Sequence, residues 1–127
     1  NAMITSCFLG RKLIDYLKTE HLKVLCDPAN ALYCGENPSK NALDSMEGGY
    51  LGHVHMKDVE VSIHQATIEC VALGKGQMSP HLQAISDRLN AIGYDGSMSL
   101  ESVYRPSDGD FEDGFNASIE KFKNLYS

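Results

Sequence analysis

The sequence has few basic residues, no long apolar run and no closely paired cysteines. Its 11 lysines and arginines stand against 17 acidic residues, which gives a net charge of −6. This balance argues against a surface for nucleic acid or for an anionic membrane. No apolar run approaches the roughly 20 residues that cross a bilayer, and no signal-peptide pattern opens the chain. We therefore expect a cytoplasmic protein that binds neither nucleic acid nor membrane.

The size of the chain predicts one domain. A chain of 127 residues, 43% of them hydrophobic, can bury a modest core. Asn1 and Ala2 precede a methionine and resemble an expression-tag remnant, so residues 1–2 are set aside and residues 3–127 are taken as a single domain. The cysteines form no C-x-x-C pair, and we expect buried free thiols rather than zinc ligands or disulfides. They are Cys7, Cys26, Cys34 and Cys70.

The hydrophobic pattern alternates between the periods of helices and strands. One helix is especially clear, with Ser79 expected as N-cap, Pro80 in the first turn and Gly93 just past its end. The segment 61–73 predicts a hairpin or a long loop. Helices are expected over 6–19, 38–46, 79–93 and 111–126, and strands over 22–28, 51–57 and 98–103. This order predicts parallel strands joined by helical crossovers, and hence an α/β fold.

Each expected strand has one apolar side and one side with an ionisable group near its carboxyl end. In GHVHMKD, residues 52–58, His53, His55 and Lys57 share one face of the strand, opposite Val54 and Met56. Asp27 and Glu101 stand near the ends of the other two strands. Such an arrangement is typical of the mouth of a (β/α)8 barrel, where active sites lie.

Asp27, His55 and Glu101 together form a mixed oxygen and nitrogen donor set. This set suits Mn²⁺, Mg²⁺, Co²⁺ or Zn²⁺ better than a thiolate site would. The alternative is that His55 is a satisfied core histidine, that Asp27 caps the turn before Pro28, and that Glu101 sits on an exposed strand end. The pattern of residues leaves both interpretations open.

The segments CDPANA, GHVHMKD, ALGKG and AIGYDGSMSLES, in this order, resemble the last part of the xylose-isomerase-like TIM barrels. That family includes sugar phosphate isomerases and epimerases, inosose dehydratase and apurinic-site endonucleases. The likeness runs from about Arg11 to Tyr126 and implies strands 6–8 of a partial (β/α)8 barrel with their flanking helices. The endonuclease branch would need further ligands where this chain has Ile68 and Cys70, so DNA repair is not expected.

The resemblance also implies roles for individual residues. Asp27, His55 and Glu101 match the family's metal ligands, and Glu101 matches a catalytic glutamate that moves a proton through an enediolate. Three further residues are implied as substrate contacts: Asn30, His53 and Lys57. His53 and Lys57 have the alternatives of packing inside the barrel or, for the lysine, of an ion pair with Asp58. No cofactor other than a divalent metal is implied.

A complete barrel of this kind needs about 250 residues, so we expect the sheet to be covered by another copy of the chain in a homo-oligomer. The expected function is metal-dependent isomerisation or epimerisation of a small sugar or sugar phosphate. The alternatives are a catalytically inactive barrel remnant that self-associates and a related lyase similar to inosose dehydratase. The ALGKGQM turn is expected as a plain turn, with phosphate binding through its backbone amides as the alternative.

Overall fold

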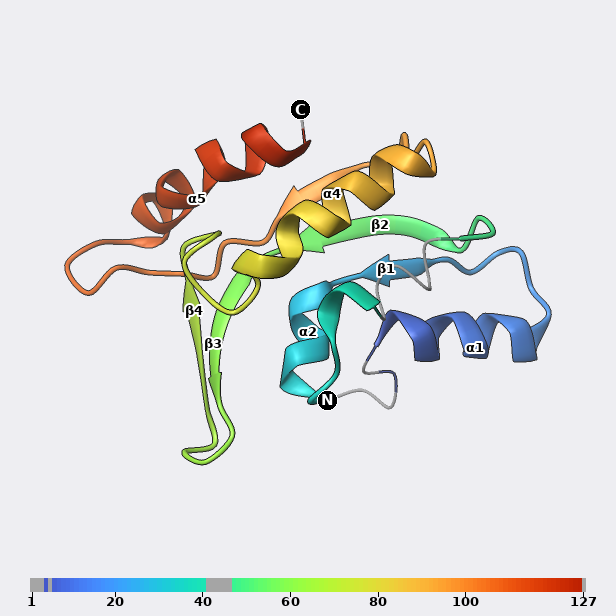
Figure 1. Cartoon of the computed structure of the whole chain (residues 1–127), viewed down its shortest axis with the longest axis horizontal. Helices are drawn as coiled ribbons and strands as arrows, with labels where there is room; N and C mark the ends of the chain where they lie inside the picture. The colour runs from blue at the N-terminus through green and yellow to red at the C-terminus, as the bar shows by residue number, and fades with distance from the viewer. Residues whose placement is uncertain (1–3, 5, 41–46, 127) are drawn as a thin grey trace.

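The computed structural model describes residues 4, 6–40 and 47–126 of the chain (Figure 1). Its helices are α1 (Cys7–Leu17), α2 (Pro28–Tyr33), the 3-10 helix η1 (Ser79–His81), α4 (Leu82–Ala91) and α5 (Phe111–Tyr126). Its strands are β1 (Val24–Cys26), β2 (Leu51–Met56), β3 (Asp58–Ser62), β4 (Thr67–Val71) and β5 (Met98–Leu100).

Three of the strands form a parallel sheet in the order β1-β2-β5. The register places Cys26 beside Val54 and His55 beside Ser99, so the carboxyl ends of the strands meet at one edge. The predicted α/β fold with parallel strands is confirmed. Within the described residues the sheet is open and does not close into a barrel, which is consistent with part of a TIM-barrel domain.

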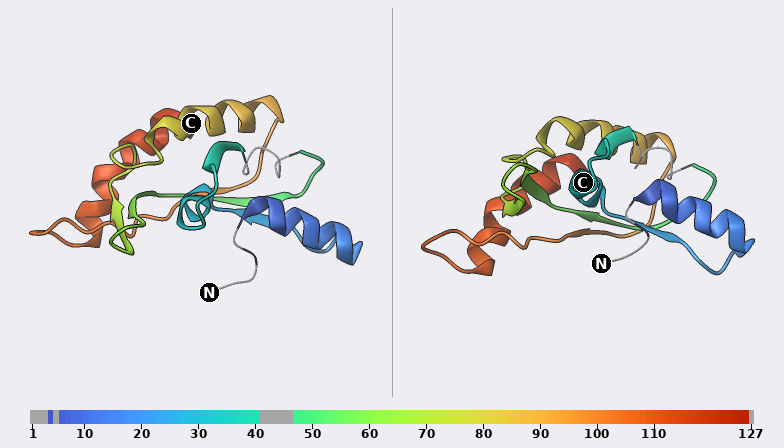
Figure 2. Two further views of the ribbon diagram at one scale, coloured as in Figure 1. Left: turned by 60° about the horizontal axis from the view of Figure 1, so that its bottom comes forward. Right: turned by 90° about the horizontal axis from the view of Figure 1, so that it is seen from below.

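The two faces of this sheet differ sharply in burial. Helix α4 lies along one side of the sheet in both views of Figure 2. On that side, strand residues are 0–6% exposed, and they belong to the main hydrophobic core. These residues are Val24, Cys26, Val54 and Met56. Leu25 points to the opposite face and is 52% exposed, as expected from the alternation of side chains along a strand.

Helix α4 contributes the largest helical share of the core. Leu82, Ile85 and Leu89 are 1%, 0% and 4% exposed, and Gly93 ends the helix with a φ of +64°, as predicted. The predicted start is wrong, because Ser79 makes no side-chain cap bond and lies in η1. The N–H of His81 donates to the carbonyl of Met78 at 2.8 Å, so the chain enters through a tight turn before α4 begins.

Residues 58–71 form the antiparallel hairpin β3–β4, which decides between the two expectations for this region. The hairpin projects away from the parallel sheet (Figure 1). Asp58 at its base is 1% exposed and accepts hydrogen bonds from the backbone N–H groups of Gly74, Gly76 and Met78 at 2.8, 3.0 and 2.8 Å. The amides of the ALGKGQM turn are therefore engaged by a carboxylate of the chain itself, which favours the plain turn over a phosphate site.

Three further segments differ from the expected elements. The strand predicted over 98–103 is limited to Met98–Leu100. The strand predicted over 22–28 is limited to Val24–Cys26, and Pro28 opens the unpredicted helix α2, where its fixed φ suits the first turn. In the helix predicted over 38–46, residues 38–40 are helical and residues 41–46 lie outside the described residues. Residues 1–2, set aside as a tag remnant, also lie outside them.

The cysteines are only partly as predicted. Cys34 is exposed and Cys70 is half-buried, whereas burial was expected for both. Cys7 and Cys26 are buried, and the thiol of Cys7 in α1 contacts the thiol of Cys26 in β1 at 2.6 Å. No helix among the described residues is long and apolar enough to cross a membrane.

Candidate metal centre

Three side chains reach the same point from the ends of the three parallel strands. Asp27 directly follows β1, His55 lies in β2, and Glu101 directly follows β5. The N–H of Glu101 donates to the carbonyl of Met56 at 2.9 Å, which extends the β2–β5 pairing to the position of the glutamate. Asp27 stands at the N-cap position of α2 but makes no side-chain cap bond, so its carboxylate is available elsewhere.

The predicted ligands lie close together on the face of the sheet opposite the core. One potential ligand atom from each of Asp27, His55 and Glu101 lies within 4.8 Å of the others. The Nδ1 atom of His55 is 3.5 Å from Oε2 of Glu101. The exposed fractions of the three side chains are 7% for Asp27, 28% for His55 and 37% for Glu101. The cluster is therefore deepest at the aspartate and open to solvent at the glutamate.

Lys57 bridges the two carboxylates of this cluster. Its ammonium nitrogen is 2.7 Å from Oδ2 of Asp27 and 2.7 Å from Oε2 of Glu101. The lysine side chain is only 11% exposed, and its ammonium lies 5.9 Å from the centre of the Tyr33 ring. Of the alternatives left open by the sequence, the ion pair with Asp58 is wrong, because Lys57 pairs with Asp27 and Glu101.

The three charged groups have different electrostatic environments. Burial raises the pKa of Asp27 above its ordinary value, even though the hydrogen bond and charge of Lys57 act in the other direction. Burial alone would raise the pKa of Glu101 too, but the hydrogen bond and charge of Lys57 outweigh it and lower that pKa. Burial would lower the pKa of Lys57, yet its bonds to the two carboxylates raise it. The cluster therefore keeps the lysine charged and the glutamate ionised at neutral pH.

The donor set fits a divalent cation. Oδ1 of Asp27 is buried and has no hydrogen-bond partner, although a buried carboxylate oxygen normally has one. Two carboxylates and one imidazole are ligands of the kinds that Mg²⁺, Mn²⁺, Co²⁺ and Zn²⁺ accept. The residues that could hold such an ion are therefore Asp27, His55 and Glu101.

The remaining predicted site residues lie around this cluster. The ring nitrogens of His53 lie 3.1 and 2.9 Å from the hydroxyls of Ser97 and Ser99, and its ring meets that of His55 edge-on at 5.0 Å. Asn30 is half-buried in α2 and lines, with Asp27, a cavity of about 260 Å³ between α1 and β1. His53 thus shares the face of the ligands, whereas Asn30 stands to one side.

Sequence reasoning missed two features of the site. Tyr33 faces Lys57 only because α2 follows Asp27, and that helix was not predicted. The bridging position of Lys57 had a signal, since odd-numbered residues from 53 to 57 share one face of the strand. The sequence does not give the spacing of neighbouring strands, and it is this spacing that brings the lysine within reach of both carboxylates.

The family comparison agrees with this arrangement. The family model described as xylose isomerase-like TIM barrel matches residues 7–125, nearly the whole span over which the sequence resembles that family. No curated protein matches the chain. The chain belongs to the xylose isomerase-like TIM barrel family.

Proposed function

We propose that Asp27, His55 and Glu101 hold one divalent cation and that this centre serves proton transfer on a sugar or sugar phosphate. The observation that carries the proposal is that one potential ligand atom from each of these three side chains lies within 4.8 Å of the others, on the face of the sheet opposite the core. Membership of the xylose isomerase-like family supports the sugar substrate and the isomerase or epimerase class. The proposed metals are Mn²⁺, Mg²⁺, Co²⁺ and Zn²⁺.

A bound cation would supply a Lewis acid that polarises substrate oxygens and stabilises negative charge. Glu101 is the proposed base, because its lowered pKa keeps it ionised and its side chain is 37% exposed toward solvent. It would accept a proton from the carbon beside a carbonyl group, which leaves an enediolate. Return of that proton to the neighbouring carbon, with a proton passing between the two oxygens, moves the carbonyl, whereas inversion of the first carbon would need a second acid on the opposite face of the enediolate. His53 and Asn30 are the proposed contacts to substrate hydroxyls.

A hydrogen-exchange experiment tests this proposal without a known substrate. The Mn²⁺-loaded chain is incubated in D₂O with a panel of ketoses, ketose phosphates and cyclic polyol ketones, and proton NMR follows the hydrogen beside the carbonyl. We expect exchange of that hydrogen in at least one compound. A lyase similar to inosose dehydratase would begin with the same proton removal but would release a dehydrated product, which the same spectra distinguish.

Matched glutamine variants give this experiment its control. Glu101→Gln keeps the shape of the side chain and removes the base, so exchange should stop. Glu69→Gln changes an exposed glutamate of the β3–β4 hairpin and should leave exchange as in the wild type. Equal exchange in wild type and Glu101→Gln, or no exchange with any compound of the panel, would contradict the proposed function.

We also propose that the chain self-associates through the face and edge of β1. Apolar side chains of α1, of β1 and of the segment between them are 39–52% exposed, an unusual concentration for a surface that meets only water. They are Phe8, Leu13, Leu17, Leu22 and Leu25. Among the described strands, β1 has a partner on one side only, and an unpaired edge is prone to pair with another chain.

Light scattering coupled to size-exclusion chromatography measures this association. The wild-type chain should elute with a mass above that of the monomer. Leu25→Glu places a charge on the proposed contact and should shift the mass toward the monomer. A monomeric wild type with a well-dispersed NMR spectrum would contradict self-association.

A further inference from the structure

We propose that Lys57 is an internal competitor for the cation, whose ammonium group holds Asp27 and Glu101 together and has to leave before both carboxylates can bind a metal. This inference rests on the proposed metal centre and assigns its regulation to the residue that directly follows β2, the strand of His55. In this role the lysine sets how tightly the chain binds a divalent ion.

The contacts of the ammonium carry the argument. It lies 2.7 Å from one oxygen of each carboxylate, which is the length of a strong charge-assisted hydrogen bond. The Glu101 oxygen that it contacts is also the atom 3.5 Å from Nδ1 of His55. The lysine therefore occupies the glutamate oxygen that lies next to the histidine ring.

A divalent cation and this ammonium exclude one another on electrostatic grounds. Both need the same two carboxylates, and two positive charges a few ångströms apart repel strongly where solvent is scarce. Lys57 and Asp27 are 11% and 7% exposed, so little water is present to screen that repulsion. The carboxylates have to exchange one cation for the other.

The site also offers the displaced lysine a neighbouring partner. The ammonium already lies 5.9 Å from the centre of the Tyr33 ring, within the range of a cation–π contact. Oδ1 of Asp27 is buried and has no hydrogen-bond partner while the lysine holds Oδ2, so this oxygen remains as an acceptor for the cation.

Removal of Lys57 destabilises the metal-free chain, because two neighbouring carboxylates lose their positive partner. It stabilises the metal-bound chain, because a positive charge that repels the cation is gone. Both effects favour the metal. Lys57→Met, which keeps the length of the side chain, should therefore bind Mn²⁺ at least about tenfold more tightly than the wild type, given the size of coupling between close charge pairs. It should also show a larger rise in Tm on addition of Mn²⁺.

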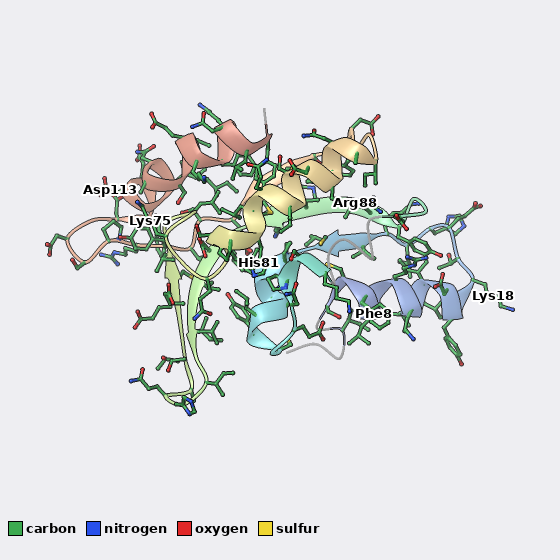
Figure 3. The ribbon with its side chains drawn as sticks, viewed as in Figure 1. Phe8, Lys18, Lys75, His81, Arg88 and Asp113 are labelled. Carbon is green, nitrogen blue, oxygen red and sulfur yellow. The ribbon has the colours of Figure 1, made fainter. Side chains whose placement is uncertain are left out.

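Calorimetric titration with Mn²⁺ at one pH and one salt concentration tests the proposal. Lys75→Met is the matched control, because it removes the same charge from an exposed position in the turn after β4 (Figure 3) and should bind as the wild type does. Lys57→Gln, which retains a hydrogen-bond donor, is the second variant if Lys57→Met does not fold by circular dichroism. Mn²⁺ is the probe because its preference for oxygen ligands keeps the cysteine thiols out of the measurement.

The outcomes separate this inference from the proposed metal centre. Tighter binding by the Lys57 variants, or binding by them alone, supports the competition. If Asp27→Asn abolishes wild-type binding while the Lys57 variants bind as the wild type does or more weakly, the metal centre stands and the competition is wrong. If neither the wild type nor any Lys57 variant binds Mn²⁺, both ideas are wrong.

Discussion

Two buried aspartates of the chain, Asp58 and Asp27, stand next to strands but have opposite surroundings. Asp58 accepts four backbone hydrogen bonds: its Oδ1 accepts from Val59 and Met78, and its Oδ2 from Gly74 and Gly76, all at 2.8–3.0 Å. Asp27 has one oxygen bound to the ammonium group of Lys57 and one oxygen without a hydrogen bond. The first carboxylate is fixed by the backbone, and the second is held by a group that can leave.

This difference separates a carboxylate that stabilises the fold from one that can bind a ligand. Backbone N–H groups cannot withdraw from Asp58 without unfolding the turn between β4 and η1, so that aspartate stabilises the fold and offers nothing to a ligand. A side-chain ammonium can rotate away from Asp27, and an oxygen without a partner gains by meeting a cation. We therefore expect substitutions at Asp58 to affect stability, and substitutions at Asp27 to affect metal binding.

The largest effect on stability is expected from Asp58→Asn. The amide nitrogen of asparagine would face two backbone N–H donors, which leaves both of them without an acceptor and should cost at least about 3 kcal/mol of unfolding free energy. Urea unfolding measures this loss, with Asp108→Asn on the exposed turn before α5 as the control. A loss of stability no greater than that of the control would remove the structural role of Asp58.

Gly76→Ala should destabilise the same turn by about 2 kcal/mol. A Cβ atom at Gly76 would lie 2.5 Å from Oδ1 of Asp58 and 2.6 Å from the carbonyl of Val59, so the carboxylate would have to move. Because both substitutions disturb one set of hydrogen bonds, their effects on the unfolding free energy should not add in the double variant. Strict additivity in a double-mutant cycle would show that the two sites act independently.

Asp27→Asn should cost only about 1 kcal/mol of stability, because it exchanges an ion pair for a weaker hydrogen bond and leaves Lys57 paired with Glu101. Its main effect should be the loss of the rise in Tm that Mn²⁺ gives the wild type. Thermal melting with and without Mn²⁺ measures both quantities. The comparison between the aspartates would fail if Asp27→Asn destabilised the chain more than Asp58→Asn did.

The smallest expected effect is a pH dependence at Glu101. Its folded pKa is lowered, so its ionised form stabilises the fold above its ordinary pKa of 4.5, and this contribution is lost as the pH falls through the lowered folded value. Solvent screening at a side chain that is 37% exposed limits the contribution to about 0.5 kcal/mol. Urea unfolding from about pH 6 to about pH 3 should show the stability of wild type and Glu101→Gln converging. A difference in unfolding free energy that stays constant over this pH range would contradict this role of the Glu101 carboxylate.

The sequence predicted the placement of the three candidate ligands better than it predicted the details around them. Alternation along the strands was enough to place Asp27, His55 and Glu101 on one face, because the period of a strand is regular and parallel strand ends meet at one edge. This alternation could not predict which positively charged side chain lies between the carboxylates. That depends on the spacing of strands and on helix α2, whose six residues are too few to show a helical period.

The role of Asp58 was hidden for a similar reason. Three of its four partners are backbone amides 16 to 20 residues away, and backbone groups carry no signal in a sequence. The error at Ser79 follows from the same contact, because Asp58 holds the N–H of Met78 and the chain enters α4 through η1 instead of a serine cap. Local patterns predict elements, whereas contacts between distant segments decide how those elements begin and end.

The most direct test of the central claim is a crystal structure of the wild-type chain grown with Mn²⁺, with anomalous scattering used to locate the ion. We expect one anomalous peak coordinated by Asp27, His55 and Glu101, with the ammonium of Lys57 moved away from both carboxylates. Crystals whose Mn²⁺ lies elsewhere, with Lys57 still bridging the aspartate and the glutamate, would contradict it.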